Sequence, residues 1–228
     1  MLERAVRYQS QEEVLQELEE FKKQQRIKEC EERLNDLIFQ RLCKIPKRFQ
    51  NKAFSDFTIN NESQKKVKNV IERFCKTFLE RAKDGNNIIF HGNPGTGKTL
   101  LSNILYQELV KNNYNCHYES SLNFLKTLQE ERHSPSSNFE SSLNKFQKYD
   151  LLIIDEVTEG CGRATCPSPW ETQILFKIID TRYQNNACTL VITNRSKHDL
   201  LIRLGEPTMD RLFEKGIALA FDWESYRK

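Results

Sequence analysis

Residues 92–99 read Gly-Asn-Pro-Gly-Thr-Gly-Lys-Thr and fit the phosphate-binding pattern G-x-x-x-x-G-K-[ST]. Apolar residues precede the stretch at 88–90 and follow it from Leu100, which predicts a strand, a glycine loop and a helix. Glycines let backbone N–H groups turn inward around a phosphate, and the start of a helix adds partial positive charge. The residues expected to bind the phosphates are Gly92, Asn93, Pro94, Gly95, Thr96, Gly97, Lys98 and Thr99. This phosphate loop predicts a nucleoside triphosphate ligand; the alternative is a chance glycine turn.

Two acidic residues stand at the end of a second apolar run. Residues 151–154 are all apolar, and Asp155 and Glu156 follow them. Ligands of parallel sheets bind at the carboxyl ends of the strands. We therefore expect Asp155 and the Thr99 hydroxyl to hold Mg²⁺, while Lys98 reaches the β- and γ-phosphates. Glu156 is the expected general base that accepts a proton from an attacking water; the alternative is an exposed turn residue.

A neutral amide follows a third apolar run. Asn194 comes directly after residues 189–193. At the end of a parallel strand it would orient the attacking water or contact the γ-phosphate. The alternative is a structural one, because either Asn194 or Ser196 would also fit as the cap of the next helix.

Strands and helices alternate from residue 87 onward. Strands are expected at 87–91, 115–119, 151–154, 189–193 and 217–221, and helices at about 98–112, 121–131, 168–184 and 196–204. Such alternation predicts an α/β fold with a five-stranded parallel sheet covered on both faces.

The residues before this sheet fall into two parts. Apolar residues at helical spacing predict a helix over 10–43, so residues 1–44 form a small helical region. This region has little core of its own and is expected to bind a partner, or to dock on the rest of the chain; an ordinary helix with a solvated face is the alternative. A basic linker at 45–60 leads to the domain at 61–228 that contains the phosphate loop, and this domain is expected to open with a helix from Asn61 to Gly85.

Composition narrows the class of protein. The 228 residues are 29% charged, the net charge is +3, and a run of apolar residues long enough to cross a membrane is missing. The first residues lack the apolar centre of a signal peptide, so we expect a cytoplasmic protein. The seven cysteines are then expected to be free thiols. Cys161 and Cys166 lie closest together, but their spacing does not favour a zinc site.

Several further motifs resemble the DnaC-type bacterial helicase loaders, which are AAA+ ATPases of the DnaC/IstB-like group. The order of the three strand ends is similar to AAA+ ATPases in general. The more specific matches are residues 45–49 (IPKRF), 54–57 (FSDF), 204–206 (LGE), 209–212 (MDRL) and 221–227 (FDWESYR). The resemblance covers about residues 45–227. It implies two further catalytic residues: Arg211 as an arginine finger acting on a neighbour's ATP, and Arg227 as a sensor arginine acting in the same chain.

Both arginines have simpler interpretations. Arg211 would also fit as a salt bridge on a helix surface. Arg227 lies one residue from the end of the sequence, where fraying is the alternative. The chemical need for a cation is clear, since charge on the γ-phosphate must be stabilised during transfer.

The resemblance also implies the partners. It implies a DnaB-type replicative helicase, self-association in a spiral on that helicase, and contact with single-stranded DNA. DNA contact is expected at Lys126, Lys145 and Lys148, among the interleaved phenylalanines Phe124, Phe139 and Phe146. Arg163 is a further candidate. The alternative for the phenylalanines is core packing.

The expected activity is ATP hydrolysis, stimulated by assembly and by single-stranded DNA. The expected role is to place a helicase on single-stranded DNA, with hydrolysis releasing the loader. Two alternatives stay open: an IstB-type ATPase that serves a transposase, and an adaptor that binds nucleotide without hydrolysing it.

Overall fold

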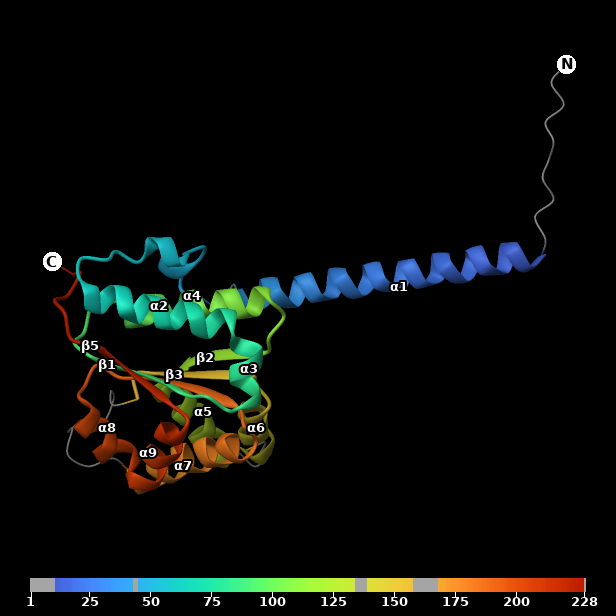
Figure 1. The fold of residues 1–228 in the computed structure, drawn as a ribbon. Helices are drawn as coiled ribbons and strands as arrows, with labels where there is room; N and C mark the ends of the chain where they lie inside the picture. Colours follow the sequence, from blue (N-terminus) through green and yellow to red (C-terminus); the bar gives the residue numbers. More distant parts are fainter. Residues whose placement is uncertain (1–10, 43–44, 134–138, 158–167, 228) are drawn as a thin grey trace, which may run out of the picture. The chain divides into compact units, whose positions relative to one another are not determined.

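The computed structural model describes residues 11–42, 45–133, 139–157 and 168–227, and they form two compact units. Unit 1, Met1–Lys44, contains the helix α1 (Gln11–Leu42). Unit 2, Ile45–Lys228, contains a sheet and its covering helices (Figure 1). Among the described helices, none combines the length and the apolar composition that a membrane-spanning helix needs.

Within the described residues, five strands form one parallel sheet in the order β2-β3-β4-β1-β5. The strands are β1 (Ile88–Gly92), β2 (Cys116–Ser120), β3 (Leu151–Asp155), β4 (Cys188–Ile192) and β5 (Ile217–Phe221). Each expected strand is present, with its ends within one residue of the prediction. Of the three inner strands, β3 and β4 are buried along their whole length, as their apolar residues predict for a sheet covered on both faces.

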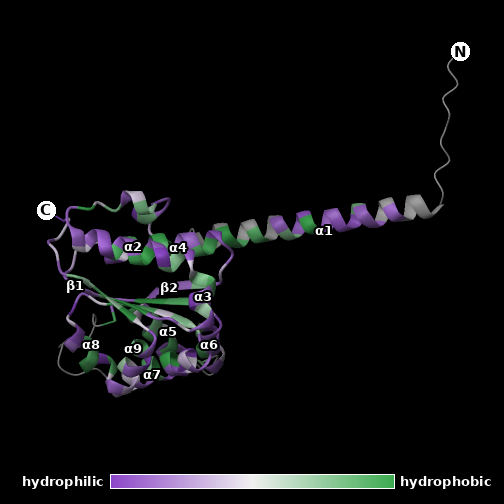
Figure 2. Ribbon diagram, in the orientation of Figure 1, coloured by the Kyte–Doolittle hydropathy of each residue, from purple (hydrophilic) through white to green (hydrophobic). Residues whose placement is uncertain are grey.

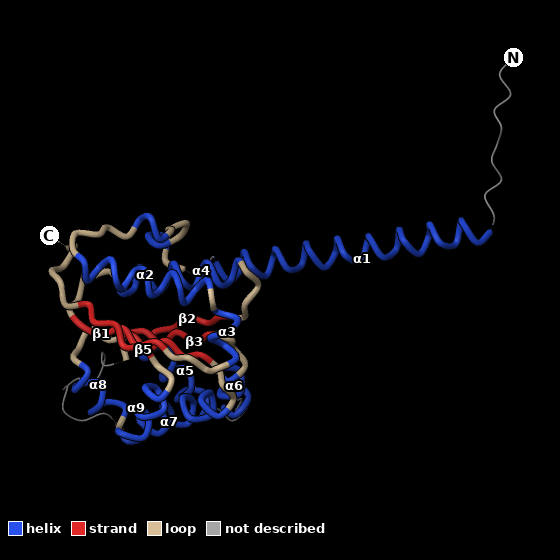
Figure 3. The backbone as a smooth tube through the Cα atoms, viewed as in Figure 1, coloured by secondary structure: helices blue, strands red, loops and turns tan. Residues whose placement is uncertain are grey.

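Helices cover both faces of this sheet. They are α2 (Glu62–Lys76), α3 (Phe78–Lys83), α4 (Lys98–Lys111), α5 (Ser121–His133), α6 (Phe139–Gln147), α7 (Pro169–Gln184), α8 (Lys197–Leu204) and α9 (Glu206–Glu214). Helices α2 and α4 lie on one side of the sheet and α5–α9 on the other (Figures 1 and 3). Before them, the linker contains two short 3₁₀ turns, η1 (Lys47–Phe49) and η2 (Phe54–Asp56).

Four helices, α2, α3, α6 and α9, differ from the sequence prediction. The single helix expected from Asn61 to Gly85 is broken at Thr77 into α2 and α3. Helices α6 and α9 were not predicted. Helix α6 is mostly polar, and α9 follows α8 after the single residue Gly205, which ends one helix and begins the next.

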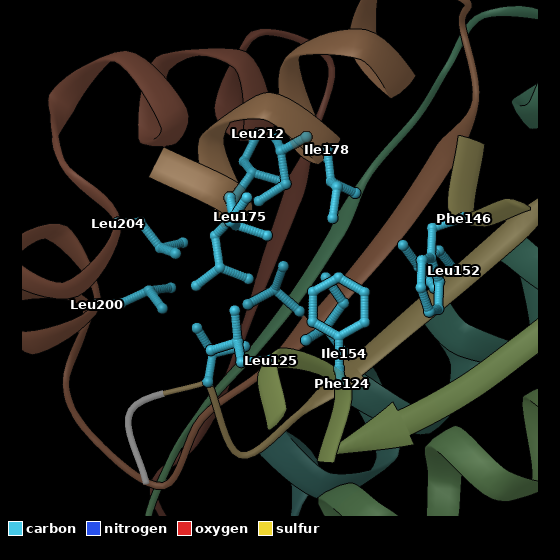
Figure 4. Close-up of a cluster of buried hydrophobic side chains, with 14 of the residues drawn as sticks. Phe124, Leu125, Phe146, Leu152, Ile154, Leu175, Ile178, Leu200, Leu204 and Leu212 are labelled. Carbon is cyan, nitrogen blue, oxygen red and sulfur yellow. The ribbon is translucent and has the colours of Figure 1, made fainter. Parts of the chain in front are cut away.

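A large hydrophobic core lies between the sheet and α5–α9. Figure 4 shows part of this cluster, and Figure 2 shows the hydrophobic strands between the two helical layers. The fully buried side chains of this core include Phe124, Leu128, Leu143, Leu175 and Leu212. Each such side chain contributes roughly 1.5–3 kcal/mol when it leaves water. This core supports the strands whose ends carry the polar residues.

One buried cation ties α6, α7 and β4 together. Arg182 is completely buried, and its Nη1 donates to the carbonyl oxygens of Phe146 (2.8 Å) and Tyr149 (2.9 Å). Its Nε donates to Thr189 Oγ1 (3.1 Å), and its Nη2 donates to the Cys188 carbonyl. Burial lowers the pKa of Arg182 to about 10, so the guanidinium stays charged at neutral pH. It satisfies carbonyls that would otherwise be buried without partners.

We predict that Arg182→Met strongly destabilises the protein. The substitution keeps an unbranched side chain but leaves several buried carbonyls unpaired, each at a cost of roughly 1–3 kcal/mol. Urea unfolding should show a loss of at least about 3 kcal/mol. The exposed Arg132→Met on α5 is the matched control and should change stability little. Equal stabilities of the two variants would contradict this role for Arg182.

Candidate nucleotide-binding site

The carboxyl ends of three adjacent strands meet at the phosphate loop. The loop leaves β1 between its sheet neighbours β4 and β5. The Gly92 amide donates to the Arg195 carbonyl just after β4 (3.3 Å), and the Asn93 amide donates to the Phe221 carbonyl at the end of β5 (2.9 Å). The loop is therefore anchored on both sides by main-chain hydrogen bonds.

The loop is wrapped around the amine of Lys98. This side chain is only 4% exposed, and its Nζ donates to the carbonyls of Gly92 (2.8 Å) and Asn93 (2.6 Å). Thr96 Oγ1 also donates to the Asn93 carbonyl (2.7 Å). Gly97 directly precedes α4 with a φ of 94°, a left-handed conformation that favours glycine. The positive charge of Lys98 and the N-terminus of α4 thus lie at the same place, which suits an anion.

Asp155 lies beside Thr99 across the end of β3. The two side-chain oxygens, Thr99 Oγ1 and Asp155 Oδ2, are 3.4 Å apart, and Asp155 is buried. Tyr118 on β2 donates its hydroxyl to the same carboxylate oxygen. Burial and the neighbouring Asp155 charge raise the pKa of Tyr118, so it remains a donor at neutral pH. A hydroxyl and a carboxylate in this arrangement fit the hard oxygen ligands that Mg²⁺ prefers.

Glu156 turns away from the strand at this point. Its φ is 58°, which is uncommon for a residue with a side chain. Its backbone is held on both sides, because its N–H donates to Asp155 Oδ1 (2.8 Å) and its carbonyl accepts from Ser121 Oγ (2.8 Å). The Glu156 side chain is exposed at the edge of the cavity described below.

Asn194 is half-buried and lines the same cavity. The capping role considered for it belongs to Ser196. The Ser196 hydroxyl accepts from the Asp199 amide (3.1 Å), and Asp199 bonds back to the Ser196 amide (3.1 Å). Because Ser196 is the cap of α8, the Asn194 amide is not needed for that purpose.

These residues surround a cavity of about 700 Å³. Pockets of roughly 300–1,000 Å³ are typical of small-molecule sites. The predicted residues that line it are Pro94, Gly95, Gly97, Lys98, Thr99, Asp155, Glu156, Asn194 and Arg227. The linker also contributes lining residues, including Arg48 and Phe57. Sequence reasoning did not single out Tyr118 or Tyr226, which also line it. Tyr226 lay within a motif that resembled helicase loaders, but the motif carried no indication of its role.

Arg211 is not among the residues that line the cavity. It lies on α9, where its Nε donates to Asp180 of α7 and its Nη1 donates to the Pro207 carbonyl (2.8 Å). The guanidinium also lies over the Phe176 ring at 5.0 Å. The Arg211 side chain is 28% exposed, and its guanidinium is paired with a carboxylate of its own chain.

The expected DNA-binding residues are only partly described. Lys126, Lys145 and Lys148 are exposed on α5 and at the end of α6, and Lys126 lies 3.9 Å from Glu130. The idea that interleaved phenylalanines stack on DNA is wrong for Phe124 and Phe146, because both are buried in the core. Arg163, Cys161 and Cys166 lie outside the described residues.

Comparison with solved structures supports this architecture. A crystal structure of the DnaC helicase loader superposes with a TM-score of 0.64 at 22% identity, covering 77% of this chain and 99% of that chain. A replication initiator DnaA, bound to AMPPCP and single-stranded DNA, also gives a TM-score of 0.64 at 20% identity, over 79% of this chain and 52% of that one. The chain thus has the α/β fold of AAA+ P-loop ATPases.

Sequence comparison identifies relatives of two kinds. The replicative helicase loader DnaC of Escherichia coli (strain K12) is 28% identical over 181 residues, 78% of this chain and 70% of that protein. A protein of Geobacillus stearothermophilus, described as an ATP-binding protein of insertion sequence IS5376, is 26% identical over 193 residues, 82% of this chain and 72% of that protein. The model of the IstB-like ATP binding protein family matches residues 3–228. Because this match spans both units and the whole phosphate-loop cavity, the chain belongs to the family of IstB-like ATP-binding proteins.

Proposed function

We propose that this protein is an ATP-dependent loader that binds a DnaB-type replicative helicase and helps place it on single-stranded DNA. The observation that carries the proposal is the cavity in which Lys98, Thr99, Asp155, Glu156 and Asn194 converge. The similarity to the replicative helicase loader DnaC over 78% of the chain supports the choice of partner. Hydrolysis of ATP would release the loader.

Each residue of the cavity has a role that its position supports. The amides of the phosphate loop and Lys98 would bind the phosphates, and Thr99 with Asp155 would hold Mg²⁺, which neutralises phosphate charge when bound. Glu156, exposed at the edge of the cavity, would accept the proton of the attacking water. Asn194, on the neighbouring strand end, would orient that water.

The two arginines would act in different chains. Arg227 lines the cavity and would contact the phosphates of its own ATP. Arg211 lies away from its own cavity and is partly exposed on α9, as a residue that acts on a neighbour's ATP must be. It would exchange its contact with Asp180 for the neighbour's γ-phosphate. Hydrolysis would then depend on self-association, in a spiral on the helicase.

Residues 1–44 would form the helicase-binding region, followed by the linker at 45–60 and the ATPase domain at 61–228. Helix α1 exposes apolar side chains at spacings of three and four residues, namely Ile27, Cys30, Leu34 and Leu37. These residues lie on one face of the helix. A stripe of exposed apolar side chains on a helix is suited to a protein partner.

Single-stranded DNA would contact α5, α6 and the residues that follow β3. The exposed cations Lys126, Lys145 and Lys148 would bind the phosphate backbone, with Arg163 as a further contact. Because Phe124 and Phe146 are buried, this contact would rest on charge rather than on stacking.

A second candidate function is that of a transposition ATPase acting with a transposase. The relative associated with insertion sequence IS5376 covers a similar share of the chain at 26% identity. Both candidates use the same ATP site, so the partner protein distinguishes them. The non-catalytic adaptor is disfavoured, because Lys98, Asp155 and Glu156 all lie around one cavity.

We predict that Glu156→Gln binds ATP with nearly unchanged affinity but hydrolyses it at least about 100-fold more slowly. A general base contributes a factor of roughly 10²–10⁴ to rate, and the amide cannot accept the proton. Turnover should be measured with helicase and single-stranded DNA present, and binding by calorimetry with ATP and Mg²⁺. Glu108→Gln, on the surface of α4 at a salt bridge to Lys111, is the control. Wild-type turnover in Glu156→Gln would remove Glu156 from the mechanism.

We also predict that Leu34→Glu weakens capture of a DnaB-type helicase by about tenfold or more, as loss of a central interface residue does. Gln25→Glu adds the same charge at an exposed position on the other side of α1 and should leave capture intact. Both variants should bind ATP normally. Capture of the transposase of a neighbouring insertion sequence, and not of a helicase, would support the second candidate instead.

A further inference from the structure

The residues that follow β5 lie directly on the phosphate loop. We call residues 222–227 the strap. Three hydrogen bonds join the strap to the loop: Asn93 Nδ2 to the Asp222 carbonyl (3.3 Å), Trp223 Nε1 to the Thr96 carbonyl (3.1 Å) and the Tyr226 amide to the Gly95 carbonyl (2.9 Å). The strap therefore holds the loop at Asn93, Gly95 and Thr96, all before Lys98.

Two glycines of the loop leave room for this close approach. A Cβ on Gly95 would lie 2.0 Å from Ser225 Oγ of the strap. A Cβ on Gly97 would lie 2.8 Å from Cε2 of Phe57 in the linker. Real Cβ atoms do not approach other atoms so closely. These two glycines thus admit the strap and the linker as well as a phosphate.

Trp223 connects the strap to the lysine of the loop. Its indole is 7% exposed and packs on the Phe221 ring, with centroids 5.0 Å apart. Its N–H donates to the Thr96 carbonyl, Thr96 Oγ1 donates to the Asn93 carbonyl, and this carbonyl also accepts from Lys98 Nζ. A shift of the indole would therefore move the carbonyl that holds the Lys98 amine.

Tyr226 connects the strap to the linker. Its hydroxyl donates to the Thr58 carbonyl (2.6 Å), while its amide is bonded to the loop at Gly95. Its ring meets the Phe57 ring edge-on at 6.0 Å. Arg227 follows directly and lines the cavity. Tyr226 thus fixes the backbone from which Arg227 extends.

We propose that the strap sets the conformation of the phosphate loop, with Trp223 as the positioning residue for the loop and Tyr226 as the positioning residue for Arg227. The ligand concerned is a nucleoside triphosphate with Mg²⁺. The inference rests on nucleotide binding at the loop, and it holds whichever partner protein the chain serves. Binding of nucleotide should therefore change the environment of the Trp223 indole.

A single-tryptophan variant tests the loop part of the proposal. The sequence contains two tryptophans, Trp170 and Trp223, so Trp170→Phe leaves Trp223 as the only indole. Titration of the full chain with Mg²⁺ and a non-hydrolysable ATP analogue should shift or quench the Trp223 emission. The change should saturate at the concentration at which calorimetry detects binding. Trp223→Phe, which leaves Trp170 as the matched probe, should show no such change.

The same variants give a functional readout. Trp223→Phe keeps a ring for packing but loses the bond to Thr96, so the Kd for the analogue should rise by about three- to tenfold. Tyr226→Phe should lower kcat by about three- to tenfold with Kd nearly unchanged, because it frees Arg227 rather than the loop. Tyr114→Phe, which alters a tyrosine that is not among the residues lining the cavity, is the control for Tyr226→Phe.

If calorimetry shows binding while the Trp223 emission stays constant and Trp223→Phe binds normally, the strap does not set the loop. If Trp223→Phe fails to fold, the emission of the Trp170→Phe protein still decides, because that protein keeps Trp223. The binding measurements use the isolated chain, so a failure to capture a helicase would contradict the proposed function without affecting the strap.

Discussion

The site depends on one constraint: the phosphate loop, which follows β1, is anchored by hydrogen bonds to the two strands that flank β1 in the sheet. The Gly92 amide donates a hydrogen bond to the carbonyl of Arg195, which follows β4. The Asn93 amide donates to the carbonyl of Phe221, at the end of β5. Both bonds exist because β1 lies between β4 and β5 in a parallel sheet. The start of the loop is therefore fixed to the sheet by its own backbone, and a preorganised site needs less ordering on binding.

Charge burial at this edge of the sheet follows from the same arrangement. Lys98 and Asp155 are both buried. The hydrogen-bond partners of the lysine and those of the carboxylate come from two different parts of the chain. The loop's own carbonyls hold the lysine amine, while Tyr118 and the Glu156 amide hold the carboxylate. Fully hydrogen-bonded charges in a partly desolvated site exert strong fields on a bound phosphate.

Much of this could be predicted from local sequence patterns. Apolar runs and the alternation of strands with helices predicted the five strands, and the glycine pattern predicted the phosphate loop. Residues that depend on pairing between distant segments could not be found in this way. Tyr118 reaches Asp155 because Ser120 and Asp155 are in register across β2 and β3, and a single sequence does not show register. Trp223 and Phe57 meet only after β5 has placed the strap on the loop. The family resemblance implied a role for Arg211, with a surface salt bridge as the alternative, but its partner Asp180 lies on another helix and could not be named from the sequence. The sequence spacing of Phe124 and Phe146 fitted either core packing or a DNA-binding surface. The structure buries both side chains, so they belong to the core.

We propose that this ATP site serves the loading of a ring helicase. The most direct measurement is unwinding by a DnaB-type helicase of an oligonucleotide annealed to circular single-stranded DNA covered by single-strand-binding protein. A closed ring cannot thread onto a circle, so the helicase alone should unwind little. We predict that adding this protein with ATP produces rapid unwinding, and that Lys98→Ala does not support it. Unwinding that is the same with and without the protein, at concentrations where it binds ATP, would contradict the claim.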